Sequence, residues 1–117
     1  MIEATIISYL NNIEGMAPAY AERPENVPPK YILVEKTGTS TENRITTSTI
    51  AVQAISDTLQ NGSLLDAMEL NEAVKVAMAD LVTMDSVSGV SLNSDYNFTD
   101  PTTKEYRYQA VFLVTHY

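Results

Sequence analysis

The amino-acid sequence predicts an α+β domain in which an antiparallel β-sheet carries two main helices on one face. In two segments, apolar residues recur at helical spacing. In two longer segments, apolar and polar residues alternate, as they do in the paired strands of hairpins. The expected order is helix, edge strand, hairpin, helix, hairpin, which is typical of helices packed on an antiparallel sheet. The chain of 117 residues is predicted to form a single domain over positions 1–117, without repeats or linkers.

The first element is predicted to be a helix over residues 2–13. Ile2, Ile6, Leu10 and Ile13 recur at helical spacing, and Gly15 follows where a glycine commonly ends a helix. Residues 16–30 contain four prolines, which lack a backbone donor and favour extended geometry. We therefore expect an extended arm that pairs, at most briefly, around residues 19–21 as an edge strand.

A β-hairpin is predicted over residues 31–56. The segments "KYILVEK" and "NRITTSTIAVQAIS" are rich in β-branched residues and flank a polar stretch, so residues 36–43 are expected to form the hairpin tip. Apolar residues gather in the second half of the second segment. Its threonine-rich start is therefore expected to be exposed, with the core beginning later in the strand.

The clearest helix is predicted over residues 64–82. Ser63 followed by Asp66 resembles a capping box, and Ala67, Leu70 and Val74 begin an apolar stripe that continues to Leu81. The last element is a C-terminal hairpin over residues 87–117. Its strands flank the turn-forming segment "TDPTTK".

Composition and charge exclude several classes of function. Fifteen acidic residues outweigh seven basic ones, and the formal net charge of −8 disfavours tight binding to nucleic acid or to an anionic membrane surface. The absence of cysteine excludes disulfides, thiolate catalysis and cysteine-ligated zinc. The first residues lack the basic region of a signal peptide, so the protein is expected to stay in a reducing, soluble compartment.

The segment "VEKTGTSTENRI" contains the Lys-Thr-Gly tripeptide of penicillin-binding enzymes. That chemistry also needs a serine with a lysine three residues later, and no serine here has one. A phosphate-binding loop needs a second glycine and a helix after it, whereas Gly38 is followed by a strand segment. The segment is therefore interpreted as the tip of a β-hairpin, and no enzyme activity is expected.

Three further candidate sites have simpler structural interpretations. "DYNFTD" at 95–100 imitates a calcium loop but has Asp100 where glycine is required. The carboxylates of Asp66, Glu69 and Glu72 share a helix edge, where acids complement the helix dipole. His116 has no evident orienting partner in the sequence. No catalytic residue, cofactor or metal is expected.

Contact with other proteins is the remaining expectation. The polar stretch of the first hairpin and two tyrosines on one face of the last strand are the predicted interface residues. They are Thr37, Gly38, Thr39, Ser40, Thr41, Glu42, Asn43, Arg44, Tyr106 and Tyr108.

Over nearly its whole length the chain resembles the tail terminator, or tail completion, proteins of long-tailed bacteriophages and prophages. The resemblance rests on the leading helix, the strand region "YILVEKTGTSTENRITTSTIAVQA", the helix "LDAMELNEAVKVAMADL" and the last hairpin, "VSLNSDYNF" with "YRYQAVFLVTHY". It implies a structural protein of the virion tail and neck, made in the cytoplasm of a bacterial host. It also implies a ring, typically a hexamer, that caps the tail tube, joins it to the head-completion protein and lets DNA pass without specific binding.

Two alternatives stay open at this point. Another neck or tail component, such as a head-closure or adaptor protein, would share the assembly role at a different position. A small dimeric ligand-binding or regulatory domain would belong to a different class of protein.

Overall fold

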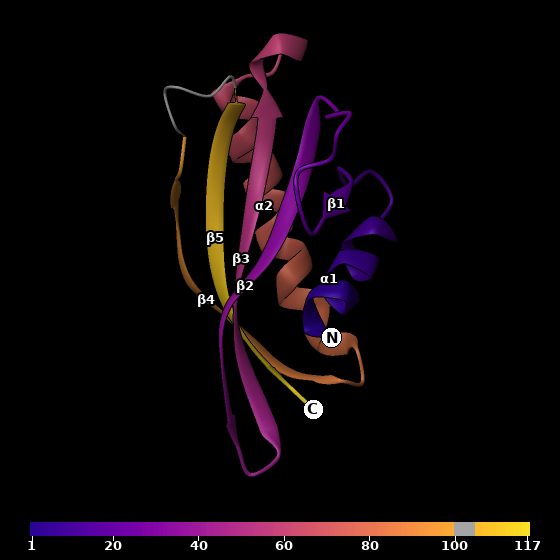
Figure 1. Cartoon of the computed structure of the whole chain (residues 1–117), viewed down its shortest axis with the longest axis vertical. Coiled ribbons are helices and arrows are strands. Elements are labelled where there is room, and N and C mark those ends of the chain that lie inside the picture. Colours follow the sequence, from indigo (N-terminus) through magenta and orange to yellow (C-terminus); the bar gives the residue numbers. More distant parts are fainter. Residues whose placement is uncertain (100–104) are drawn as a thin grey trace.

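The computed structural model describes residues 1–99 and 105–117 and has an α+β architecture, as the sequence predicts (Figure 1). A five-stranded sheet is accompanied by two α-helices and two short 3-10 turns. In chain order the elements are α1 (Ile2–Asn11), β1 (Ala19–Tyr20), β2 (Lys30–Glu42), β3 (Ile45–Asp57), η1 (Thr58–Gln60), α2 (Leu64–Ala79), η2 (Asp80–Thr83), β4 (Val87–Asn97) and β5 (Glu105–His116).

The strands are ordered β1-β2-β3-β5-β4, and the sheet is mixed rather than wholly antiparallel. Every pair is antiparallel except β1 with β2, in which Ala19 aligns with Ile32 and Tyr20 with Leu33. β1 is short because prolines surround it and because the side chain of Asn11 brackets it. The Asn11 side chain donates to the Ala19 carbonyl oxygen at 3.1 Å and accepts from the Ala19 amide at 2.8 Å.

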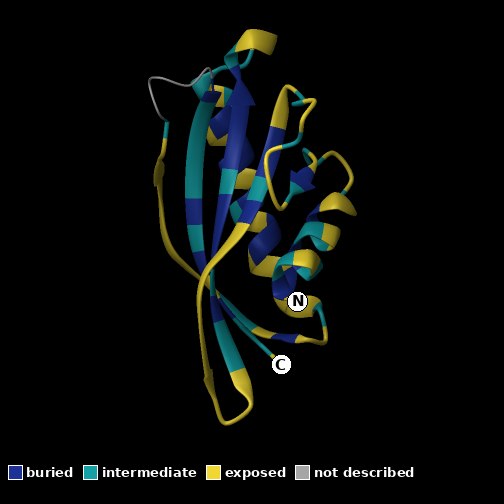
Figure 2. Ribbon diagram, viewed as in Figure 1, coloured by how far each residue is buried: buried dark blue, intermediate teal, exposed yellow. Residues whose placement is uncertain are grey.

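Both helices cover the same face of the sheet, as predicted. Alternate residues of β2, β3 and β5 form one apolar core with the helices. The strands that lie beside the helices carry many of the buried positions (Figure 2). The buried core residues are Ile2, Ile6 and Leu10 of α1; Leu70, Val74, Ala77 and Met78 of α2; and Ala19, Ile32, Val34, Ile50, Val52, Ala54, Leu81, Val87, Ala110, Phe112 and Val114. The late entry of β3 into the core is confirmed, since burial of its apolar residues begins at Ile50.

The helix ends differ slightly from the predicted ones. α1 ends at Asn11, two residues early, and Gly15 then adopts a left-handed φ of 82°. α2 begins after Ser63, whose hydroxyl accepts from the Asp66 amide at 3.1 Å, which confirms the predicted cap. Its last predicted turn is the 3-10 turn η2. The predicted turn of the C-terminal hairpin spans 99–104, of which 100–104 lie outside the described residues.

Gly62 links η1 to α2 and has no room for a side chain. A Cβ atom there would lie closer than 3.0 Å to the Asp57 carbonyl oxygen and the Ser56 hydroxyl oxygen. We expect Gly62→Ala to lower the free energy of unfolding by about 1–3 kcal/mol, measured by urea denaturation, because overpacked sites cost that much. The matched control is Gly89→Ala, whose Cβ would meet nothing nearer than 3.9 Å. Equal stability of the two variants would contradict this prediction.

Candidate interaction surface

The hairpin β2–β3 turns at Asn43 and Arg44, which corrects the prediction that residues 36–43 form its tip. Both turn residues have positive φ, 53° and 67°, as a two-residue hairpin turn requires. Residues from Gly38 to Glu42 are paired with β3. Gly38 lies beside a bulge that leaves Thr37 out of register, so it does not turn the chain. The threonine-rich sequence extends the strand because β-branched residues favour that conformation.

Hydroxyl groups hold the outer hairpin together where no core is present. Thr39 and Ser48 lie opposite each other with their hydroxyl oxygens 3.2 Å apart, and Thr41 and Thr46 repeat this at 3.2 Å. The Thr37 hydroxyl donates to the Thr49 carbonyl at 3.4 Å. Cross-strand hydroxyl pairs of this kind stabilise a sheet modestly. They account for a long hairpin that keeps its shape without apolar packing.

Every residue from Glu35 to Ile45 is exposed, and this segment projects past the helices to one end of the molecule (Figure 2). β1 pairs only with Ile32 and Leu33, so the rest of the outer edge of β2 has no partner strand in the described ranges. An exposed edge of this length is a template for pairing with another chain. We call the segment from Glu35 to Ile45 the projecting hairpin.

The structure places Tyr106 and Tyr108 away from the projecting hairpin. Both are half-buried on the helix-covered face of the sheet, where Tyr106 pairs across the strands with Ser56 and Tyr108 with Ala54. Ala54 is nine residues from Ile45 along β3, or about 30 Å at roughly 3.3 Å per residue. The predicted interface residues therefore form two separate groups at the two ends of the sheet.

A groove of about 900 Å³ lies between α1, the proline-rich arm and α2. The Tyr9 hydroxyl donates to the Ala77 carbonyl at 2.7 Å and so ties the two helices together at the groove. The groove is lined by Tyr9, Ile13, Glu14, Gly15, Met16, Ala17, Pro18, Pro28, Pro29, Lys30, Glu69, Leu70, Ala73, Val76, Ala77 and Asp80. Burial and the charge of Asp80 raise the pKa of Tyr9, so its hydroxyl stays protonated.

The groove is not predicted from the sequence, although one signal for it is present. Val76 is 68% exposed on the outer side of α2, opposite to what a simple apolar stripe predicts. The other wall consists of small residues and prolines after α1, which no periodicity describes. Only the packing of the arm against α2 brings the two walls together.

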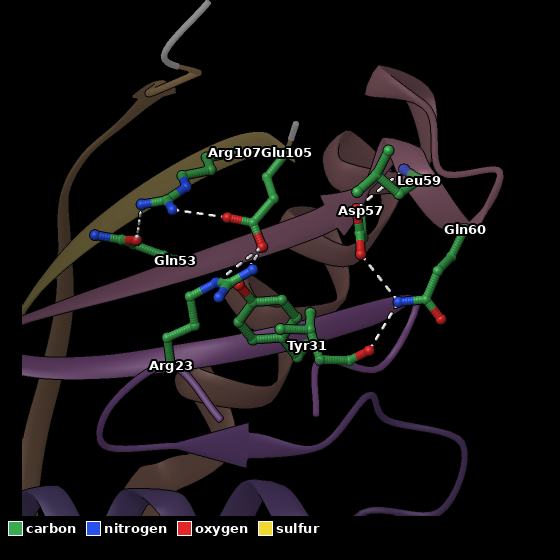
Figure 3. Close-up of polar contacts among 9 residues, drawn as sticks. Arg23, Tyr31, Gln53, Asp57, Leu59, Gln60, Glu105 and Arg107 are labelled. Carbon is green, nitrogen blue, oxygen red and sulfur yellow. Dashed lines mark hydrogen bonds and ion pairs between the residues drawn. The ribbon is translucent and has the colours of Figure 1, made fainter. Parts of the chain in front are cut away.

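A polar network lies on the other face of the sheet, around the buried carboxylate of Glu105 (Figure 3). The Tyr31 hydroxyl donates to the Glu105 carboxylate, and the Arg107 guanidinium pairs with the same carboxylate at 2.8 Å. The more exposed Arg23 approaches the same carboxylate at 3.4 Å. Burial raises the pKa of Tyr31 to about 12, aided by the adjacent carboxylate. The network joins β2, β5 and the arm at the end of the sheet opposite the projecting hairpin.

His116 has a partner that the sequence analysis did not identify. Its Nε2 atom lies 2.8 Å from the Ser48 hydroxyl oxygen, across the β3–β5 pair. A serine beside a histidine can act as a nucleophile with its base. Ser48 is 0% exposed, however, so its hydroxyl cannot reach an external substrate. The pair is therefore a structural contact between β3 and β5, and it can be recognised only once the register of the two strands is known.

The acidic candidates occupy ordinary structural positions. Asp95 accepts hydrogen bonds from Lys75 at 2.9 Å and Asn71 at 3.1 Å, tying β4 to α2. The hydrogen bond from Lys75 lowers the pKa of Asp95, and it outweighs the opposing effect of burial. Asp100, the sixth residue of the calcium-like motif, lies outside the described residues. Within residues 1–99 and 105–117, no group of three or more potential ligands is placed to hold a metal.

Comparison with known proteins identifies no family. A scan against protein-family models and a search of curated proteins both found no match to the chain. In the part of the chain that the structure describes, no helix is long and apolar enough to span a membrane.

Proposed function

We propose that the protein is a structural component of a bacteriophage neck, a tail terminator that caps the tail tube and joins it to the head-completion protein. The observation that carries the proposal is the projecting hairpin. It exposes a continuous run of residues from Glu35 to Ile45, and its end extends beyond the helix layer. A neighbouring subunit can use such a surface through strand pairing or side-chain contact. Together with the whole-chain resemblance stated above, this supports assembly as the protein's role.

The charge of the chain supports the ring arrangement. Each copy has a formal net charge of −8, so six copies bring about −48 charges around one axis. A negatively charged channel repels the DNA backbone, which lets DNA slide through without being held. The proposed partners are therefore further copies of this chain, the tail tube protein and the head-completion protein.

The groove favours a second candidate function, binding of a small ligand by a dimer. Its volume of about 900 Å³ lies within the roughly 300–1,000 Å³ typical of small-molecule sites. This candidate would leave the projecting hairpin without a role. It is therefore the less complete explanation of the surface.

Electron microscopy of the purified protein tests the proposal. We expect closed rings of one diameter with a central channel, and gold-labelled protein at the head-proximal end of isolated phage tails. Label on the portal vertex of tailless heads would instead assign the protein to head closure. Particles no larger than a dimer, with saturable uptake of a small molecule, would favour the ligand-binding candidate.

A further inference from the structure

We propose that the tip of the projecting hairpin of one copy docks in the α1–α2 groove of the next copy. Ile45 would occupy the apolar part of the groove, and Arg44 would meet its acidic rim. The inference rests on the proposed ring and names the contact that builds it.

The tip presents an apolar group beside a positive charge. Ile45 is 41% exposed, and Arg44 precedes it in the turn with an exposed side chain. The other residues of the projecting hairpin are polar, charged or glycine, so Ile45 is the one large apolar side chain between Glu35 and Ile45. Arginine is one of the residues enriched among those that dominate the binding energy of protein interfaces.

The groove has the complementary properties. Val76, Ala73 and Met16 contribute apolar wall, with Val76 largely exposed to solvent. Three carboxylates, Glu14, Glu69 and Asp80, are among the lining residues, and Lys30 is the one basic residue among the described residues that line the groove. An arginine that brings an apolar neighbour therefore matches this groove in both charge and polarity.

The tip cannot reach the groove of its own chain. Lys36 pairs with Glu3 in the first turn of α1, with 3.8 Å between the Lys36 Nζ and Glu3 Oε1 atoms. From there β2 runs six residues further to Glu42, about 20 Å at roughly 3.3 Å per residue, before the chain turns at Asn43 and Arg44. The groove instead begins at Tyr9, in the last turn of α1, and continues along the residues that follow the helix. Contact between tip and groove is therefore intermolecular, and such a head-to-tail contact closes into a ring when the rotation permits.

Cysteine cross-linking tests the contact directly because the natural chain has no cysteine. Protein carrying Ile45→Cys is mixed with protein carrying Val76→Cys under mild oxidation. We expect a covalent dimer in the mixture, and a ladder of larger species from the chain carrying both changes. The matched control replaces Val76→Cys with Leu92→Cys, a position on β4 with 47% exposure. Each single variant alone controls for self-pairing.

A charge exchange tests the electrostatic part. We expect Arg44→Glu and Glu69→Lys each to raise the protein concentration needed for half-assembly about tenfold, and the double variant to restore it to within about threefold. Glu25→Lys changes the charge equally at an exposed site outside the groove. It should leave assembly unchanged.

The outcomes separate this inference from the proposed function. An intact ring whose 45–76 cross-link is no stronger than the 45–92 control overturns the docking inference and leaves the ring standing. The docking inference is also overturned if the effects of the two single changes on the concentration needed for half-assembly simply add in the double variant. A protein that stays monomeric overturns both the ring and the docking.

Discussion

Replacing Glu105 with glutamine is expected to lower the free energy of unfolding by about 3 kcal/mol at pH 7, measured by urea denaturation. Glu105 is only 5% exposed, and its carboxylate holds the Tyr31 hydroxyl and the Arg107 guanidinium. Glutamine keeps the shape but removes the negative charge, so Arg107 loses its charged partner inside the network. Breaking a buried ion pair on one side costs about 3–5 kcal/mol, and the partial exposure of Arg107 places this case at the low end.

The same variant predicts a dependence of stability on pH. Burial raises the pKa of Glu105, but the hydrogen bond from Tyr31 and the charges of Arg107 and Arg23 outweigh it and hold the pKa below its ordinary value of 4.5. A carboxylate with a lowered folded-state pKa contributes stability above the unfolded-state pKa and loses it as the pH falls through the folded-state pKa. The stability difference between the natural protein and Glu105→Gln should therefore shrink as the pH falls below about 4.5. A difference that stays constant down to pH 3 would show that the charge is not its source.

Shortening the projecting hairpin is expected to abolish assembly while the protomer stays folded. Removing Ser40–Glu42 together with Ile45–Thr47 deletes three matched residue pairs and joins Thr39 and Ser48 to the unchanged turn. The hairpin then becomes shorter by about 10 Å, at roughly 3.3 Å per residue, and loses Ile45. We expect only monomer at concentrations where the natural protein is fully assembled.

Two controls keep this result interpretable. The free energy of unfolding should fall by no more than about 1 kcal/mol, because the deleted residues contribute nothing to the core cluster and break only two pairs with β5. Deleting Ser40–Glu42 alone leaves Ile45–Thr47 unpaired on one side and should be less stable than the matched deletion. A shortened variant that still assembles fully would exclude the projecting hairpin as the contact.

Most of the fold can be predicted from the sequence because the spacing of apolar residues that indicates a helix or a strand also decides which of them face the core. The predicted stripe packs in the core from Leu70 to Leu81, and alternate residues of β3 join the same core from Ile50 onward. Ser63 as the cap of α2 is a local signal that needs no tertiary information. The order of elements then leaves few alternatives to helices on one face of a sheet.

The remaining features depend on contacts that no local pattern encodes. Gly38 suggested a turn, but the turn falls at Asn43 and Arg44 because the threonines pair as strands on both sides of it. The parallel pairing of β1 depends on the side chain of Asn11, eight residues before Ala19. The Glu105 network joins residues 74 positions apart, and the groove appears only when the arm packs beside α2.

The mass of the purified protein in solution, followed by light scattering over a range of concentrations, tests the central claim most directly. One chain has a mass of 12.9 kDa, so a closed ring of six has a mass of about 77 kDa. We predict a single species near that mass, which stops growing with concentration because a closed ring has no free contact. A mass that stays at that of one or two chains at every concentration would contradict the account.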